Sequence, residues 1–271
     1  MRLDKFICKS TALTKEQVVE RLLNNQVAVN KAIVSDAAFQ VHENNHVTLD
    51  GQLLVCRPFR YLLMNKPANT ICSNVDEVYP SVLNRLTDLD NEVGSCDVNE
   101  SGIDAPNIDT PDINTTDIDT HDIDRPDTPK ILETTELHIA GRLDADTTGL
   151  ILITDDGRWT FNITLPTNDC KKVYRVGLSK PLHPHLIDQF NQGIQLQGEA
   201  KLTLPATLVQ LAEKEVLLTI TEGKFHQVKR MFAAVGNRVV KLHREQIGEV
   251  ILDVELGKWR YLTPLEVASF V

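Results

Sequence analysis

The apolar run Leu-Ile-Leu-Ile at residues 150–153 constrains the fold of this chain more than any other stretch. An apolar run of this length, bounded by turn residues, predicts a strand that is buried on both faces of a sheet. The turn signal Thr-Asp-Asp-Gly at 154–157 follows it, and a polar loop with Arg142, Asp144 and Asp146 precedes it. Because a buried strand fixes the loop beside it, these side chains are candidates for a functional site.

The charge of the chain is distributed unevenly, which bears on its partners. The net charge of −10 over 271 residues at first argues against a nucleic-acid partner. Residues 91–136 hold 13 of the 38 acidic residues and only 2 basic ones, so the rest of the chain is nearly neutral. The acidity therefore belongs mostly to one segment, and a nucleic-acid partner stays open.

Several classes of protein and site are disfavoured by what the sequence lacks. No run approaches the roughly 20 apolar residues of a membrane span, and the first residues lack the apolar centre of a signal peptide, so we expect a cytoplasmic protein. The five cysteines form no Cys-x-x-Cys pair, which disfavours a disulfide framework or a zinc site. His183 and His185 are the closest histidines to a ligand pair, and a loop is the simpler interpretation, so we expect no metal.

The first 57 residues read as a small α/β module. Leu3, Phe6 and Ile7 have the spacing of the inner face of a helix. Thr-Lys-Glu-Gln at 14–17 has the form of a capping box and predicts the start of a second helix. Short strands are expected near residues 27–30 and 47–51, where apolar and polar residues alternate.

The remaining residues alternate between strand and helix signals. We expect strands at 61–64, 171–176 and 216–220, where apolar and aromatic residues are concentrated. We expect a short helix or a turn at 158–164, and helices at 185–190 with a stop at Gly193 and after Gly223 with a stop at Gly236. The start of that last helix, with Lys224, Lys229 and Arg230 nearby, is suited to binding anions.

Several of these motifs resemble those of one enzyme family. Gly-Arg-Leu-Asp-x-Asp-Thr-Thr-Gly-Leu at 141–150 resembles the central motif of pseudouridine synthases, in the branch of the bacterial small-subunit (16S) rRNA enzymes, the RsuA family. Asn-Lys-Pro at 65–67, Gly-x-x-His-Gln-x-Lys-Arg-Met at 223–231 and the segments 242–248 and 259–263 continue the resemblance. Arg-Leu-Asp-Lys-x-Ile at 2–7, a helix and Val-x-Val-Asn at 27–30 resemble the S4 RNA-binding domain.

The resemblance implies an α+β fold. It places an S4-like RNA-binding module at 1–57 and a catalytic domain at 58–271, built on a mixed, mainly antiparallel sheet flanked by helices. The acidic segment at about 91–135 interrupts this domain and departs from the family, with isoleucines every five residues from 103 to 123. It reads either as a short β-helical array or as a disordered insertion, which we favour because five isoleucines cannot offset the entropy of ordering. We expect it to repel RNA from one flank.

The implied activity is the isomerisation of a uridine to pseudouridine in 16S rRNA, by resemblance at uridine 516. The N1–C1′ bond breaks and C5 joins C1′, so no cofactor is required. The family's nucleophilic carboxylate corresponds to Asp144, the cation that keeps it ionised to Lys229, and the tyrosine that lies on the base to Tyr174. Phe225 would form an apolar wall of the site or pack in the core.

The resemblance also suggests which residues contact RNA. Arg142 would fill the space left by the flipped base or hold a flanking phosphate. Other basic residues of the catalytic domain would hold backbone phosphates: Lys171, Lys172, Lys224 and Arg230. In the S4-like module the candidates are Arg2, Lys5, Lys9, Lys15, Arg21 and Lys31. The expected partner is rRNA, within a partly assembled small subunit, and the expected state is a monomer.

Three alternatives stay open at this point. The S4-like module departs from the family pattern, with Thr14-Lys15 in place of Ser-Arg and with Asn25 and Lys31 in place of turn glycines. Together with the acidic segment, this leaves room for an rRNA-binding assembly factor without catalysis. The target could also be 23S rRNA. Asp144 and Asp146 could form the carboxylate pair of a glycosidase, but the basic motifs would then have no role.

Overall fold

The computed structural model describes residues 1–11, 13–42, 44–87, 134 and 136–270. The chain divides into two compact units, Met1–Phe59 and Arg60–Val271, so the division falls two residues beyond the predicted boundary. The predicted acidic insertion at about 91–135 lies outside the described residues apart from Thr134.

The first unit contains two helices and a small antiparallel sheet. The helices are α1 (Leu3–Ser10) and α2 (Lys15–Leu23), and the sheet has the order β2-β1-β3-β4. The strands are β1 (Val27–Val29), β2 (Ala32–Ile33), β3 (Val47–Leu49) and β4 (Gln52–Leu53). The predicted capping box is confirmed, because the amide of Gln17 donates to the Thr14 hydroxyl and the Gln17 side chain accepts from the Thr14 amide.

Two turns of the first unit have the backbone conformation that favours glycine. Asn25 has φ of 57° and Lys31 has φ of 73°, in the left-handed region. Asparagine tolerates this region better than lysine does, so Lys31 carries the larger strain. These are the two positions where the S4 domain that the sequence resembles usually has turn glycines.

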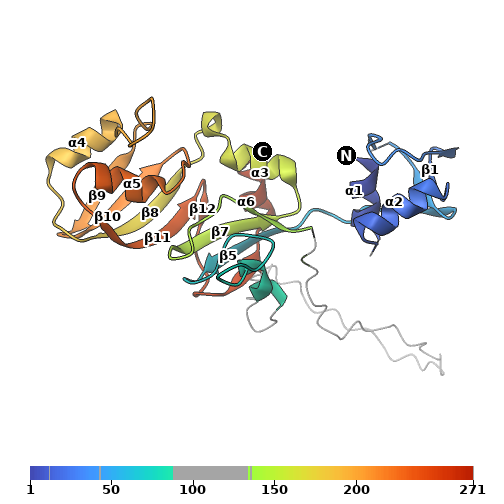
Figure 1. The fold of residues 1–271 in the computed structure, drawn as a ribbon, viewed down its shortest axis with the longest axis horizontal. Helices are drawn as coiled ribbons and strands as arrows, with labels where there is room; N and C mark the ends of the chain where they lie inside the picture. The colour runs from blue at the N-terminus through green and yellow to red at the C-terminus, as the bar shows by residue number, and fades with distance from the viewer. Residues whose placement is uncertain (12, 43, 88–133, 135, 271) are drawn as a thin grey trace, which may run out of the picture. The chain divides into compact units, whose positions relative to one another are not determined.

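The second unit is built on one large mixed sheet (Figure 1). Its strands run in the order β13-β5-β7-β11-β8-β10-β9, with β6 beside β7 and β12 beside β11. Every pairing is antiparallel except that of β7 with β11. The strands are β5 (Tyr61–Lys66), β6 (His138–Ala140), β7 (Thr148–Thr154), β8 (Lys172–Leu178), β9 (Thr207–Ala212), β10 (Glu215–Ile220), β11 (Val239–Ile247), β12 (Val250–Ile251) and β13 (Trp259–Tyr261). The predicted mixed, mainly antiparallel sheet is confirmed.

Strand β7 lies inside this sheet, as the apolar run predicts. The four side chains at 150–153 are completely buried. Each contributes roughly 1.5–3 kcal/mol relative to an exposed position. β5 pairs with β7 on one side, and the short parallel contact with β11 lies on the other. The loop before β7 is therefore attached to the most buried part of the unit.

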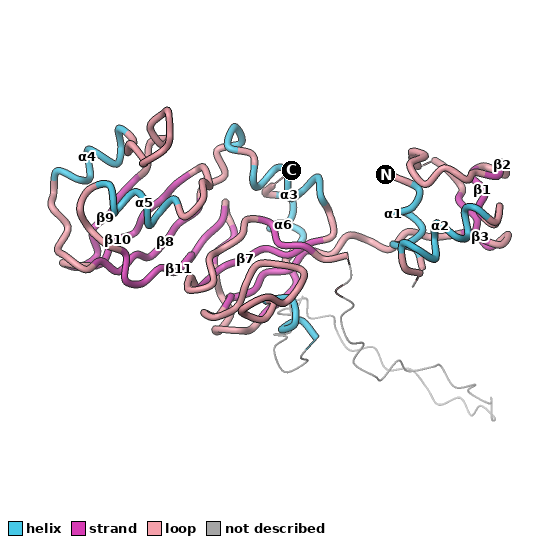
Figure 2. The backbone as a smooth tube through the Cα atoms, viewed as in Figure 1, coloured by secondary structure: helices cyan, strands magenta, loops and turns pink. Residues whose placement is uncertain are grey.

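Short helices pack against this sheet (Figure 2). Among the described residues, the α-helices are α3 (Gly157–Thr164), α4 (His185–Gln192), α5 (Gln227–Ala234) and α6 (Pro264–Ala268), and the 3-10 helices are η1 (Val82–Thr87) and η3 (Pro166–Asn168). Helices α4 and α5 share a core with β8 to β11, and α3 and α6 share one with β5 and β7. Asp156 starts α3 by accepting from the amides of Arg158 and Trp159. Of the two possibilities at 158–164, a helix or a turn, the structure has the helix, and the predicted helix at 185–190 is confirmed.

None of the helices in the described ranges combines the length and the apolar character that a membrane crossing requires.

Candidate active site

The loop between β6 and β7 carries Asp144 and is held in place by backbone hydrogen bonds. The Thr147 amide donates to the Asp144 carbonyl at 3.1 Å, which closes a turn around the carboxylate. The Asn69 amide donates to the Ala145 carbonyl at 2.8 Å. The Leu143 amide lies 3.3 Å from the sulfur of Cys72. Residues 69 and 72, which precede the undescribed segment 88–133, and Thr147, which follows it, thus fix the position of Asp144.

A buried lysine supports the same loop. Lys66 ends β5 and is completely buried, and its ammonium group donates to the carbonyls of Thr147 at 2.9 Å, Ala145 at 3.3 Å and Pro67 at 3.1 Å. Burial lowers the pKa of Lys66, and the nearby negative charges only partly offset that effect. The sequence motif Asn-Lys-Pro marked this position without indicating that the lysine ties the loop to β5.

Asp144 faces two side chains: Lys229 on α5, and His226, the residue just before α5. Lys229 Nζ lies 2.9 Å from Asp144 Oδ2 and 2.7 Å from Asp146 Oδ1. His226 Nε2 lies 3.4 Å from the other oxygen of Asp144, Oδ1. The sequence predicted the pairing of Lys229 with Asp144, but it assigned no role to His226 and did not predict that one lysine would bridge both carboxylates.

The charges of this cluster shift the pKa values of two of its members. Burial is the largest single effect on Lys229 and acts to lower its pKa, but hydrogen bonds and charge from Asp146 and Asp144 outweigh it, so the pKa is raised. For Asp146, burial acts to raise the pKa, and the hydrogen bond and charge of Lys229 outweigh it, so the pKa is lowered. Both groups are therefore charged at neutral pH, and Asp144 lies beside a permanent cation.

Tyr174 lies on β8 and contributes to the same cleft as Asp144. Its side chain is 7% exposed, and its hydroxyl accepts a hydrogen bond from Arg244 at 3.3 Å. Arg244 lies on β11 and is 1% exposed. Its guanidinium also donates to the carbonyls of Leu150 at 2.7 Å and Gly141 at 2.6 Å. One buried arginine thus connects the tyrosine, the start of the loop and strand β7.

A glycine allows this close approach of β7 and β11. Gly149 has φ of +108°, and a Cβ added there would lie 2.3 Å from the Arg244 carbonyl oxygen and 2.5 Å from its amide nitrogen. No side chain fits at this distance, so the parallel contact of Gly149 with Arg244 requires glycine. The glycine that ends the central motif is thus explained by the backbone beside it.

Asp144, Tyr174 and Lys229 line one cleft of about 650 Å³. This volume is in the range of pockets that hold small ligands, and it is large enough for a nucleotide. Apolar side chains form part of its wall: Ile71, Ile220, Val228 and Leu242. The arrangement offers one carboxylate, one paired cation and one aromatic ring to a bound molecule.

The predicted phosphate contacts of the second unit have different surroundings. Arg142 lines the cleft and is exposed, and Lys171 is exposed just before β8. Lys172 is 6% exposed, and its ammonium group donates to the carbonyls of Cys170 at 2.8 Å and Ile163 at 3.4 Å. Lys172 also lines the cleft, but a buried ammonium group that already donates to two carbonyls does not fit the prediction that it holds an RNA phosphate. Residues two apart in a strand share a face, so Lys172 lies on the buried side with Tyr174.

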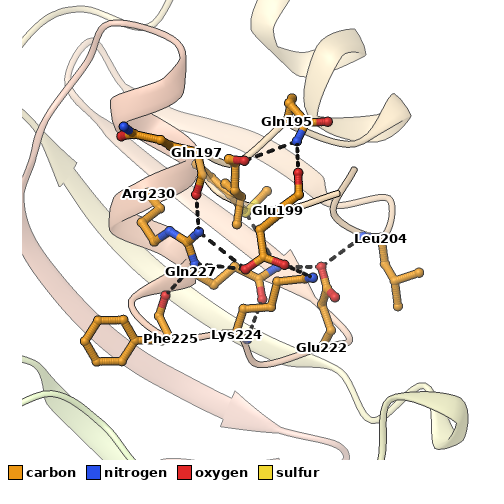
Figure 3. A network of polar contacts seen from close by, with 11 residues as sticks. Gln195, Gln197, Glu199, Leu204, Glu222, Lys224, Phe225, Gln227 and Arg230 are labelled. Atoms are coloured by element: carbon orange, nitrogen blue, oxygen red, sulfur yellow. Dashed lines mark hydrogen bonds and ion pairs between the residues drawn. The ribbon is translucent and has the colours of Figure 1, made fainter. Parts of the chain in front are cut away.

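Lys224 and Arg230 meet an acidic partner that the sequence did not reveal (Figure 3). Lys224 Nζ lies 2.9 Å from Glu199 Oε2, and Arg230 donates to Glu199 Oε1 at 3.4 Å. Arg230 also donates to the carbonyls of Gln197 at 2.8 Å and Phe225 at 3.2 Å. Both predicted phosphate ligands are thus paired within the protein. Glu199 comes from the loop between α4 and β9, and no local signal connects it with them.

Phe225 and His226 form an aromatic pair at the cleft. Their ring centroids are 3.8 Å apart with an interplanar angle of 20°. Phe225 is 76% exposed, so the prediction that it packs in the core is wrong. Both residues line the cleft that contains Asp144.

The basic candidates of the first unit also differ in their surroundings. Arg2 pairs with Asp4 at 2.7 Å, and Arg21 pairs with Asp50 at 3.3 Å. Lys9 is 5% exposed with its ammonium group over the ring of Phe59, so its prediction as an RNA contact does not fit and we drop it. Lys5, Lys15 and Lys31 are exposed, as is the paired Arg2.

Across the residues that the structure describes, no three His, Cys, Asp or Glu side chains are grouped as ligands for a metal ion.

Comparison with known proteins gives a consistent result. The family model described as RNA pseudouridylate synthase matches residues 60–234. The Ribosomal small subunit pseudouridine synthase A of Vibrio cholerae serotype O1 is 41% identical over 271 residues, with 99% of each chain covered. The protein of the same name from Escherichia coli strain K12 is 39% identical over 274 residues, with 100% of each covered. A solved structure described as a crystal structure of pseudouridylate synthase matches with a TM-score of 0.61 and 36% identity, over 100% of both chains.

Proposed function

This chain belongs to the RNA pseudouridylate synthase family and is an RNA pseudouridine synthase, and from this premise we propose that it isomerises one uridine in the 16S rRNA of the small ribosomal subunit. The names of the relatives, which refer to the small ribosomal subunit, support this choice of RNA. By resemblance the target is uridine 516. The substrate is rRNA within a partly assembled subunit, and the enzyme acts as a monomer in the cytoplasm.

The observation that carries the mechanism is the position of Asp144. Its carboxylate lies in a cleft that also contains Tyr174, and Lys229 holds Oδ2 at 2.9 Å. Lys229 thus places a positive charge beside the carboxylate and fixes its orientation, and we assign Asp144 as the nucleophile. The bond that the Asp144 carboxylate forms with the uridine breaks again before pseudouridine leaves, so that the carboxylate is regenerated.

The isomerisation conserves every atom of the uridine. The N1–C1′ bond breaks, the freed uracil turns, and a bond forms between C5 and C1′. The proton on C5 is then lost and N1 gains one, so no oxidant, reductant or group donor is needed. Tyr174 stacks on the uracil and keeps it in the cleft while it turns. The Tyr174 hydroxyl, at the far end of the ring, accepts a hydrogen bond from Arg244.

The uridine reaches the cleft only after it leaves its base stack, at a cost of a few kcal/mol. Arg142 is exposed at the cleft, and we assign it to the space that the base vacates or to the flanking phosphate. Lys171 is a second contact to the RNA backbone. We assign the S4-like unit to contact the folded RNA with exposed cations such as Lys5 and Lys15.

The test is chemical mapping of pseudouridine in total rRNA from cells that lack this protein and carry either the wild type or Asp144→Asn. We expect one site in 16S rRNA to disappear in the deletion strain and to return only with the wild type. Asp144→Asn should still bind RNA, because it changes one oxygen to an amide and leaves the basic residues in place. Product formation by Asp144→Asn would remove Asp144 from the mechanism.

The other outcomes of the mapping separate the alternatives. A site lost in 23S rRNA would move the target to the large subunit. An unchanged set of sites in both rRNAs, together with retained RNA binding, would instead favour an assembly factor without catalysis.

A further inference from the structure

An aromatic side chain projects into solvent at the edge of the cleft. Phe225 lies in the turn between β10 and α5 and is 76% exposed. Single exposed apolar side chains are common on protein surfaces, so it is the position of this ring in the lining of the Asp144 cleft that points to a role in binding. Figure 3 shows the ring directed away from the polar network around Glu199.

His226 connects the Phe225 ring with the nucleophile Asp144, because its imidazole contacts both residues. His226 Nε2 lies 3.4 Å from Asp144 Oδ1. The imidazole of His226 stacks on the ring of Phe225, with centroids 3.8 Å apart and planes inclined by 20°. One face of the phenyl ring is covered by this contact. A flat group bound on its other face would thus be separated from the uridine site by two aromatic rings.

The backbone around Phe225 is fixed before any RNA binds. Its carbonyl accepts from Arg230 Nη1 at 3.2 Å, and the preceding amide, that of Lys224, donates to Gln227 Oε1 at 2.8 Å. The side-chain amide of Gln227 in turn donates to Glu222 at 2.8 Å. The following residue, His226, has φ of 47°, a strained conformation that persists only where its surroundings hold it.

Glu199 completes this support by pairing with both cations of the turn. It binds Lys224 Nζ at 2.9 Å and Arg230 at 3.4 Å (Figure 3). The two basic side chains that frame Phe225 therefore act on the shape of the turn. A ring held in this way loses little conformational entropy when it stacks on a ligand.

We propose that Phe225 is a stacking platform for the nucleobase next to the target uridine. This rests on the function proposed above, since it names how that substrate is held. When a uridine is flipped out, the adjacent base loses a stacking neighbour, and the exposed face of Phe225 replaces it. Aromatic stacking tolerates any base, so the platform strengthens binding and places the RNA without reading its sequence. The occupant is RNA because the ring borders the uridine cleft and the exposed cation Arg142 lines that same cleft.

The test compares Phe225→Ala and Phe225→Trp with the wild type in the full-length protein. The probe is a synthetic stem-loop of 16S rRNA that carries the proposed target, uridine 516, and the readouts are its Kd and the kcat and KM of conversion. We expect Phe225→Ala to weaken binding about 5- to 150-fold, the range for loss of one base–aromatic stack, and to raise KM more than it lowers kcat. Phe225→Trp should bind as tightly as the wild type.

A matched control and a second RNA make the test specific. Phe161→Ala removes another exposed phenylalanine, 57% exposed on α3 and outside the cleft, and should leave Kd unchanged. Two further stem-loops are abasic next to the target uridine, one on its 5′ side and the other on its 3′ side. Phe225→Ala and the wild type should bind equally to the one that lacks the base stacked on Phe225, because the stack is already absent.

The proposal is overturned if Phe225→Ala weakens binding of the intact and both abasic stem-loops to the same extent, if it has no effect, or if Phe161→Ala has the same effect. Failure of the proposed function would appear separately, as a wild type that makes no pseudouridine, while the comparison of Kd values would still be available.

Discussion

Replacement of Arg244 by methionine tests whether one buried guanidinium holds the site together. Arg244 is 1% exposed and donates to two backbone carbonyls, those of Leu150 at 2.7 Å and Gly141 at 2.6 Å, and to the Tyr174 hydroxyl at 3.3 Å. Within the described ranges its hydrogen-bond partners are neutral groups and no carboxylate pairs with it. Methionine approximates the stem of the side chain and removes every donor.

The expected loss of stability follows from these hydrogen bonds. Each buried carbonyl left without a donor costs about 1–3 kcal/mol, so the two together cost roughly 2–6 kcal/mol. Removal of a buried charge recovers part of its desolvation energy, which places the net loss in the lower half of that range, at about 2–4 kcal/mol. Arg244→Lys should lie between the wild type and Arg244→Met, because lysine keeps the charge but cannot span both carbonyls.

The measurement is urea denaturation followed by tryptophan fluorescence. Both tryptophans, Trp159 and Trp259, lie in the second unit, so the signal reports the unit that contains Arg244. Turnover, measured where the variant is folded, should fall by about tenfold or more, since the Gly141 carbonyl begins the loop of Asp144 and a small displacement of reacting groups is costly.

Arg158→Met serves as the control, because Arg158 is exposed on α3, and it should change the free energy of unfolding by less than about 0.5 kcal/mol. The reasoning fails if Arg244→Met is as stable and as active as this control.

Two further predictions concern the residues beside Asp144. Tyr174→Phe keeps the ring that stacks on the uracil and loses only the acceptor for Arg244, so KM should be unchanged and turnover should fall less than about tenfold; a larger loss of kcat would show that the hydroxyl takes part in the chemistry. Asp146→Asn tests the second partner of Lys229. The pKa of Asp146 is lowered in the folded state, so its ionised carboxylate stabilises the fold at pH values above its ordinary pKa of about 4. This contribution to stability is lost as the pH falls below that value. In urea denaturation at several pH values, the wild type should exceed Asp146→Asn in stability at pH 7, with a difference that shrinks in acid, and a constant difference would contradict the pairing.

The sequence by itself determined the elements whose causes are local. The run at 150–153 predicted the buried strand β7, the Thr14–Gln17 pair predicted the capping box, and the spacing at 185–190 predicted α4. Such signals are readable because side-chain period and capping depend on neighbours within a few residues. The motifs likewise indicated Asp144, Tyr174 and Lys229, which the fold brings into one cleft.

Only the tertiary structure decided where the remaining polar side chains go. Lys224 and Arg230 looked like free phosphate ligands until the loop after α4 placed Glu199 between them. The sequence assigned no role to Arg244. The parallel contact of β11 with β7 brings its guanidinium within hydrogen-bond distance of the Gly141 carbonyl and the Tyr174 hydroxyl. These partners are distant in sequence, and which strands and loops become neighbours follows from the packing of the whole unit. The sequence therefore shows where the basic residues are, whereas the fold decides whether each of them can reach RNA or is paired with another part of the protein.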